Sequence, residues 1–189
     1  MKIAIFGTAS PTIPQKIQDL SFEIGKYLAD KYITVVTGGC IGVPGYAIDG
    51  AIASHGVTEA FYPDLDEIAC AENKNAHNND ALHKYHSKNF FDGFTERSLC
   101  MINAVDGAII INGRIGTLSE FTIAVEEGLD VCVIEGSGGV ADHLSEIIKL
   151  AEREIPNKVI FAKNWKTGID ELIQHIHDKK EKTKVNCSI

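Results

Sequence analysis

The sequence predicts an α/β protein with a Rossmann-like, doubly wound parallel sheet and helices on both faces. Five short apolar segments recur along the chain, with a weaker sixth, and they occupy residues 2–6, 33–37, 107–111, 131–135, 158–162 and, more weakly, 57–63. They are continuously apolar and β-branched, as expected for strands that are covered on both faces. Helical patterns fill most of the intervals, and right-handed crossovers then place helices on both sides of the sheet.

The intervals between these strands carry helical periodicity. In "QKIQDLSFEIGKYLADKY" the residues Ile17, Leu20, Ile24 and Leu28 lie at helical spacing. The stretches "GTLSEFTIAVEEG" and "ADHLSEIIKLAERE" show the same pattern. Residues 65–94 interrupt the rhythm, and they predict a short helix and a long surface excursion without a strong strand. Such excursions are often lids or partner surfaces, and a merely variable loop is the alternative.

Length and composition predict one domain. The chain has 189 residues, of which 44% are hydrophobic and 23% charged, and we expect a single nucleotide-binding domain over residues 1–180. The mixed-charge stretch "DKKEKTK" predicts a short tail at 181–189. Five cysteines without a CxxC pair favour neither a disulfide framework nor a zinc site. With no apolar run of about 20 residues and no secretory signal, we expect a cytoplasmic protein without a membrane partner.

The net charge bears on possible partners. The formal charge is −8 at pH 7, and non-specific affinity for nucleic acid comes mainly from clusters of Lys and Arg. The sequence therefore predicts that nucleic acid is not a partner.

Glycines gather where the predicted strands end. Four strand-to-helix turns contain them, namely "GTASP" (7–11), "TGGCIGVPG" (37–45), "NGRIGT" (112–117) and "EGSGG" (135–139). In an open parallel sheet these turns meet at one crevice and present backbone N–H groups to a ligand. Neither GxGxxG nor the GK[ST] of a P-loop is present. The turns predict a phosphate or nucleotide site, and tight helix packing is the alternative.

The first two turns supply several candidate ligand contacts. Gly38, Gly39 and Gly42 remove side chains where a phosphate would approach, and Gly7 ends the first strand. Ser10 is a candidate contact, or it caps a helix beside Pro11.

The third turn raises a choice between capping and chemistry. Thr117 followed three residues later by Glu120 fits a capping box. Glu120 also lies at the mouth of the predicted crevice, where it would repel a phosphate and so should face a sugar or base. Arg114 or Arg97 is then the cation for the phosphate. The two interpretations are compatible.

Two motifs resemble a known family. "ERSLCM" (96–101) and "NGRIGTLSE" (112–120), separated by the strand "VDGAIII", resemble the ERKxxM and PGGxGTxxE motifs of the LONELY GUY (LOG) family, formerly described as lysine decarboxylases. That family belongs to a Rossmann-like superfamily with molybdenum-cofactor carriers and DNA-processing proteins. The resemblance spans roughly residues 2–135. Two departures stand out, because Asn112 and Arg114 occupy positions of Pro and Gly, and Ser98 replaces a Lys.

The resemblance implies a nucleoside 5′-monophosphate phosphoribohydrolase that releases a free base and ribose 5-phosphate. It makes Arg97 and Glu120 the catalytic residues, and Gly113, Gly116 and Thr117 the phosphate loop. It also implies a homodimer, and chemistry that needs neither a metal nor another cofactor. The alternative is a non-catalytic module that binds or carries a nucleotide or nucleotide-like cofactor, which Arg114 favours.

Two remaining features receive structural interpretations. His77, His83 and His86 with Asp80 lack an HExxH-type arrangement, so we expect no metal site there. Trp165 begins the last amphipathic stretch and is expected to pack rather than to bind a base.

Overall fold

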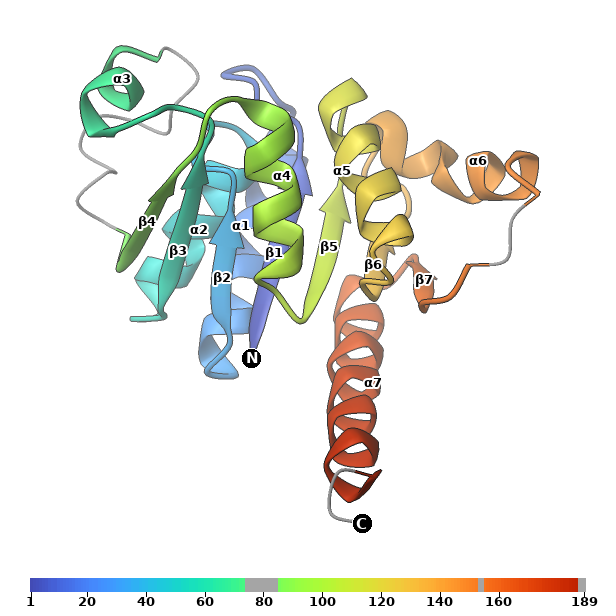
Figure 1. Cartoon of the computed structure of the whole chain (residues 1–189). Helices are drawn as coiled ribbons and strands as arrows, with labels where there is room; N and C mark the ends of the chain where they lie inside the picture. Colours follow the sequence, from blue (N-terminus) through green and yellow to red (C-terminus); the bar gives the residue numbers. More distant parts are fainter. Residues whose placement is uncertain (74–84, 153–154, 187–189) are drawn as a thin grey trace.

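A computed structural model describes residues 1–73, 85–152 and 155–186, and for residues 184–186 it describes the backbone alone. A seven-stranded, fully parallel sheet forms its centre, in the order β4-β3-β2-β1-β5-β6-β7 (Figure 1). The strands are β1 (Lys2–Gly7), β2 (Thr34–Thr37), β3 (Thr58–Tyr62), β4 (Ser87–Phe90), β5 (Gly107–Ile111), β6 (Val131–Ile134) and β7 (Val159–Ala162). The predicted fold class is confirmed.

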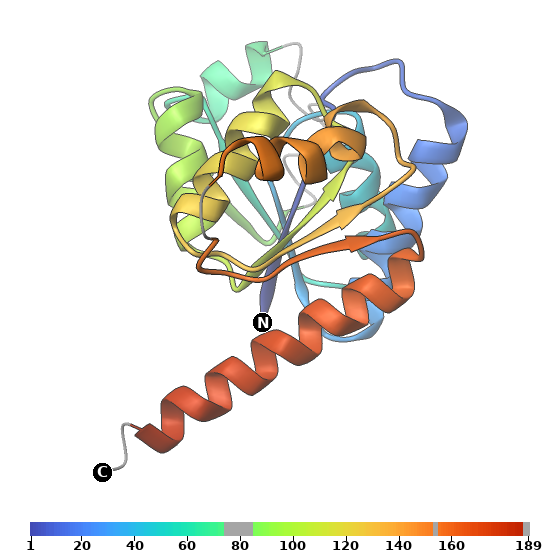
Figure 2. The same cartoon turned by 90° about the vertical axis from the view of Figure 1, so that its right-hand side faces the viewer.

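Helices cover both faces of the sheet (Figures 1 and 2). They are α1 (Gln15–Asp30), α2 (Val43–Ala53), α3 (Glu67–Glu72), α4 (Phe94–Asn103), α5 (Ile115–Glu126), a 3-10 turn (Gly139–His143), α6 (Leu144–Leu150) and α7 (Trp165–Asn186). Alternate residues of each strand enter different apolar clusters. Ile3 and Ile5 pack with α1, α2 and α7, whereas Ala4 and Phe6 pack with α4 and α5. This two-sided burial explains why the strands read as continuously apolar.

The strand order places a crevice between β1 and β5. From β1 the chain winds outward through β2, β3 and β4, and it then returns across the sheet to β5 on the other side of β1. At such a switch point the turns after two neighbouring strands lead away in opposite directions, which leaves a gap beyond their carboxyl ends. The turns that follow β1 and β5 are two of the four glycine turns.

The described part of residues 65–94 contains a short helix and a short edge strand. The short helix is present as α3, with the Asp66 carboxylate accepting hydrogen bonds from the backbone N–H groups of Ile68 and Ala69. No strong strand was expected, and the strand that forms, β4, is a short one that pairs with β3 at the edge of the sheet. Its side chains are exposed or half-buried, so "SKNF" lacks the apolar run that marks the central strands.

The C-terminal helix extends beyond the sheet. Helix α7 packs on β6 and β7 at its start, and its later turns project from the rest of the molecule (Figure 2). Trp165 packs edge-on against Tyr27 with ring centroids 5.3 Å apart. The helix continues to Asn186, through most of the stretch predicted as a tail. Among the described residues, no helix combines the length and apolarity needed to cross a membrane.

Candidate functional site

A cavity of about 240 Å³ lies at the carboxyl ends of β1, β2 and β5. Three of the four glycine turns contribute to its lining, together with the starts of α4 and α5. The predicted site residues that line it are Gly7, Gly38, Arg97, Arg114, Gly116, Thr117 and Glu120. Residues far apart in sequence thus meet where the strand order predicts a ligand crevice.

A buried ion pair forms one wall of this cavity. Arg97 on α4 and Glu120 on α5 come together with 3.2 Å between Nη1 and Oε1. The two side chains are only 7% and 12% exposed. Burial raises the pKa of the Glu120 carboxyl, and the charge and hydrogen bond of Arg97 oppose that rise. Glu120 is therefore a stronger base than an exposed glutamate, within reach of a ligand in the cavity.

Gly38 makes room for the guanidinium group. A Cβ atom at this position would lie 2.0 Å from Nη1 of Arg97, so any side chain here would displace the arginine. The Nε atom of Arg97 is buried and has no hydrogen-bond partner among the described residues. Buried donors are nearly always paired, so this unpaired N–H calls for a partner, and a ligand in the cavity would be one.

The capping box predicted for Thr117 and Glu120 is not formed. Helix α5 begins at Ile115, its N-cap is Arg114, and no side chain caps it. Thr117 lies inside the first turn, and Glu120 turns toward Arg97 instead, because the buried cation needs a counter-charge. The first hydrogen bond of the helix runs from the Leu118 N–H to the Arg114 carbonyl at 3.0 Å. The N–H groups before it lack an intrahelical acceptor.

Asn112 holds the loop that leads into α5. Its backbone is left-handed, with φ of 58°, which a proline cannot adopt. Its Oδ1 accepts hydrogen bonds from Thr8 Oγ1 at 2.5 Å and from the Gly113 N–H at 2.8 Å. Because the Gly113 N–H also points at Thr8 Oγ1 at 3.0 Å, this amide already has protein acceptors, which argues against its predicted part in a phosphate loop.

The fourth glycine turn supports the third rather than lining the cavity. Ser137 Oγ accepts from the Asn112 N–H at 2.7 Å, and the Ser137 carbonyl accepts from Asn112 Nδ2 at 2.8 Å. A Cβ atom at Gly139 would lie 2.4 Å from the Gly113 carbonyl oxygen. The expected convergence of four turns is therefore reduced to three, with the fourth packed behind them.

Three further candidates, Gly39, Gly42 and Ser10, do not line this cavity. Gly39 has φ of 67° and lies against the Tyr62 ring, and Gly42 has φ of 80° and lies against the Thr8 carbonyl. Ser10 is buried, with its hydroxyl 3.3 Å from the Thr12 nitrogen. It caps no helix, because α1 begins only at Gln15. Ser10 and Gly42 line a separate hollow of about 240 Å³.

The cavity also contains residues that the sequence did not single out. Phe94 and Ile115 are the first residues of α4 and α5, and both are large, apolar and exposed. Cys40, by contrast, belongs to the second predicted glycine turn, and it lines the cavity as well. Burial raises its pKa to about 11, so it remains a neutral thiol. A single exposed apolar residue leaves no periodic pattern in a sequence. The sequence therefore did not predict Phe94 and Ile115 as residues of the site.

Comparison with known families settles the chain's broader relationship. The sequence model of one family, described as SLOG cluster4, matches residues 1–169, which include every residue of the cavity. The chain belongs to the SLOG cluster4 family. A search among curated proteins finds no match.

Solved structures share this SLOG chain's fold. The X-ray structure of TM1055 is 22% identical with a TM-score of 0.77, covering 92% of this chain and 98% of TM1055. The molybdenum cofactor binding protein of Rippkaea orientalis is 20% identical with a TM-score of 0.71, covering 93% and 96%. DNA processing protein A of Helicobacter pylori is 20% identical with a TM-score of 0.65, covering 93% and 81%. At these identities the likeness shows the fold.

One of these likenesses corrects a prediction. The Helicobacter pylori protein binds single-stranded DNA, and its fold is that of this SLOG chain. The predicted exclusion of nucleic acid as a partner is therefore wrong. A net charge of −8 describes the chain as a whole, whereas binding depends on the charges that surround one site.

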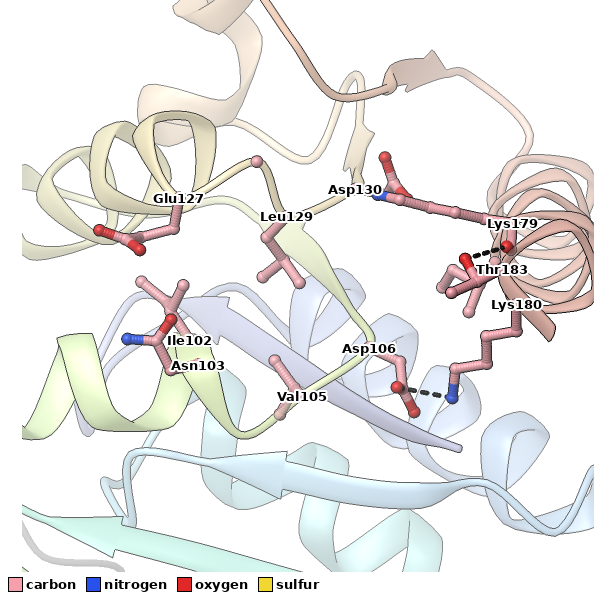
Figure 3. Close-up of a pocket in the computed structure, with 12 residues that line it drawn as sticks. Ile102, Asn103, Val105, Asp106, Glu127, Leu129, Asp130, Lys179, Lys180 and Thr183 are labelled. Atoms are coloured by element: carbon pink, nitrogen blue, oxygen red, sulfur yellow. Dashed lines mark hydrogen bonds and ion pairs between the residues drawn. The ribbon is translucent and has the colours of Figure 1, made fainter. Parts of the chain in front are cut away.

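A second cavity lies at the opposite end of the sheet and is larger, at about 590 Å³ (Figure 3). It is bounded by α7 and by the turns before β5 and β6. Its charged side chains are mostly paired within the protein, Lys180 with Asp106 at 2.7 Å and Lys179 with Asp130 at 3.2 Å. The larger volume therefore does not make this cavity the better candidate for a ligand-binding site, because its lysines and aspartates already satisfy one another.

The histidine group is only partly described. His77, Asp80 and His83 lie outside the described residues, whereas Nδ1 of His86 lies 3.2 Å from the Thr58 backbone nitrogen. Within the described ranges no three His, Cys, Asp or Glu side chains gather as metal ligands would.

Proposed function

We propose that this SLOG chain binds a nucleoside 5′-monophosphate in the cavity between α4 and α5 and hydrolyses its N-glycosidic bond. The observation that carries the proposal is the buried Arg97–Glu120 pair, 3.2 Å apart, on the wall of a cavity at the switch point of the sheet. Burying a carboxylate beside a cavity costs desolvation energy. Buried ionisable groups whose pKa is shifted in this way are concentrated at functional sites.

The phosphate would bind at the start of α5. The first N–H groups of this helix have neither an intrahelical acceptor nor a side-chain cap, and they carry the positive end of the helix dipole. Apart from its chain neighbours and its own helix backbone, a Cβ atom at Gly116 would meet nothing within 4 Å, so a ligand can approach the backbone there. Arg114 lines the cavity, is exposed, and forms no ion pair with any described residue. It would supply the cation.

The sugar would lie beside Glu120. Cleavage of the C1′–N bond develops positive charge on the ribose ring, which a nearby carboxylate stabilises. Glu120 would take a proton from the attacking water, whose oxygen bonds to C1′ while the base leaves with the bonding electrons. The proton would then pass from Glu120 to the departing base, which regenerates the carboxylate. The guanidinium of Arg97 would stabilise the charge that develops on the leaving base. The products are a free base and ribose 5-phosphate.

A second candidate is binding or carriage of a nucleotide-like cofactor without turnover. It is favoured by the loop before α5, where Asn112 at φ of 58° and the exposed Arg114 replace the Pro and Gly of the resembling hydrolases. The fold likeness to the molybdenum cofactor binding protein of Rippkaea orientalis also supports it.

One experiment separates the two candidates. The protein is incubated with a panel of nucleoside monophosphates that includes N6-substituted AMP, and released base is measured by chromatography. Base release that disappears in Glu120→Gln supports the hydrolase. Calorimetric binding without base release supports the carrier, and neither binding nor release across the panel contradicts both.

Assembly as a homodimer belongs to the same proposal and rests on the LOG resemblance. Light scattering tests it, and a monomeric mass would contradict it.

A further inference from the structure

The mouth of the cavity carries two exposed apolar side chains. Phe94 is 61% exposed and Ile115 is 81% exposed, although both are large and hydrophobic. Each is the first residue of its helix, and each lines the cavity. Exposed apolar side chains are common on protein surfaces, but these two lie together at a cavity, where they offer apolar surface to a bound ligand.

The cavity is too small for a whole nucleotide. Its volume is about 240 Å³, whereas sites that enclose a small-molecule ligand generally measure about 300–1,000 Å³. If the phosphate lies at the start of α5 and the sugar beside Glu120, those two groups occupy the enclosed space. The base must then extend to the mouth, where Phe94 and Ile115 lie.

The Phe94 ring is suited to a planar partner. The Arg97 guanidinium carbon lies 5.8 Å from the ring centroid, within the range of a cation–π contact. The residue that pairs with Glu120 therefore also approaches the aromatic ring, which ties the ring to the position of the ion pair. Every nucleobase presents a π face, and stacking on an aromatic side chain is largely independent of the base's identity.

We infer that Phe94, with Ile115 beside the mouth, forms the binding surface for the planar heteroaromatic base of the ligand. This inference rests on the proposed function, in either its hydrolytic or its carrier form. Because the base is held by its faces, AMP and GMP bind with similar affinity. Specificity for a nucleotide over a sugar phosphate then comes from Phe94.

The test compares two probes in calorimetry. The carbocyclic analogue of AMP carries a base but has no glycosidic bond to hydrolyse, and ribose 5-phosphate lacks the base. Phe94→Ala weakens binding of the AMP analogue by about 5- to 100-fold and leaves ribose 5-phosphate within about twofold. Leu150→Ala is the matched control, because Leu150 is 80% exposed and does not line the cavity; it changes neither affinity.

A conservative variant adds a direct signal. Phe94→Trp keeps the affinity for the AMP analogue, and its fluorescence is quenched by the analogue but not by ribose 5-phosphate. The native Trp165 packs against Tyr27 at the start of α7 and provides a constant background in the parent protein.

Several results would overturn the inference. Equal losses for both probes in Phe94→Ala would show a structural role, and no loss for either would show that the base lies elsewhere. A change from dimer to monomer by light scattering, with the ratio of the two affinities unchanged, would assign Phe94 to contact with a second copy. If the parent protein binds neither probe, the proposed function fails and the inference fails with it. If the parent binds both and Phe94→Ala binds both as well, only the inference fails.

Discussion

The two ends of the sheet differ in how their charges are satisfied. The amino-end cavity is the larger, at about 590 Å³ against 240 Å³, yet its lysines are paired with aspartates. At the carboxyl end, Arg97 has a buried Nε atom without a partner among the described residues. The lysines of the larger cavity are thus satisfied within the protein, whereas the smaller cavity is lined by an arginine that keeps an unpaired N–H for a ligand.

The largest expected difference between the two ends concerns catalysis. Glu120→Gln removes the carboxylate that would activate water, and we expect base release to fall by at least about 100-fold. The matched control is Glu127→Gln, because Glu127 lines the amino-end cavity; its rate should remain within about twofold of the parent. Chromatographic assays of both variants on the same nucleotide provide the measurement. Equal losses in the two variants would contradict the assignment of the site.

Glycines at the two ends should separate affinity from stability. Gly38→Ala places a methyl group 2.0 Å from Nη1 of Arg97, and Gly107→Ala places one 2.7 Å from Cδ1 of Ile176. Overpacking costs about 1–3 kcal/mol of stability in both variants. Only Gly38→Ala should also lose nucleotide affinity, by about tenfold or more, because it displaces a ligand-binding guanidinium. Urea denaturation and calorimetry on the same preparations measure the two effects. Unchanged affinity in Gly38→Ala would remove Arg97 from the ligand.

Much of the fold could be predicted from the sequence, because burial on both faces leaves an apolar run in each central strand. Strand β4 could not, since an edge strand such as "SKNF" needs no apolar run and depends on its pairing with β3. Within the site, the resemblance to the LOG motifs singled out both Arg97 and Glu120, but it did not predict that the two side chains form an ion pair. The local pattern of Thr117 and Glu120 predicted a cap instead, and the buried arginine on another helix overrode it. Such tertiary competition leaves no trace in a short window of sequence.

The loop before α5 offers a test of moderate size. Asn112→Ala removes the hydrogen bonds to Thr8 and Ser137 and forces alanine into a left-handed conformation. We expect a loss of about 1–3 kcal/mol in the free energy of unfolding. Asn103→Ala, at an exposed position lining the amino-end cavity, should change stability by less than about 0.5 kcal/mol. Urea denaturation measures both, and similar values would show that the loop is not held by Asn112.

The smallest expected effect is a difference of sign in the pH dependence of stability. Burial raises the pKa of Glu120 despite Arg97. At Asp106 burial also acts to raise the pKa, but hydrogen bonds from Lys180 and the Lys2 N–H outweigh it and leave the pKa lowered. As pH rises above the ordinary glutamate pKa of about 4.3, the unfolded state releases its proton from Glu120 first. Stability from this group is therefore lost toward higher pH.

Asp106 behaves in the opposite way. As pH falls below the ordinary aspartate pKa of about 3.9, the unfolded state takes up its proton first, so the stability contributed by Asp106 is lost toward lower pH. The measurement is urea denaturation between pH 3 and pH 7, with on the order of one measurement per half unit. As pH rises, the parent should lose stability relative to Glu120→Gln. Over the same range it should gain stability relative to Asp106→Asn. The Asp106 effect should stay below about 1 kcal/mol, because its pair with Lys180 is partly exposed. If the parent instead gained stability with rising pH relative to both variants, the attraction of Arg97 for the Glu120 carboxylate would exceed the cost of burying that charge. Glu120 would then be a weak base, and the carrier would be favoured over the hydrolase.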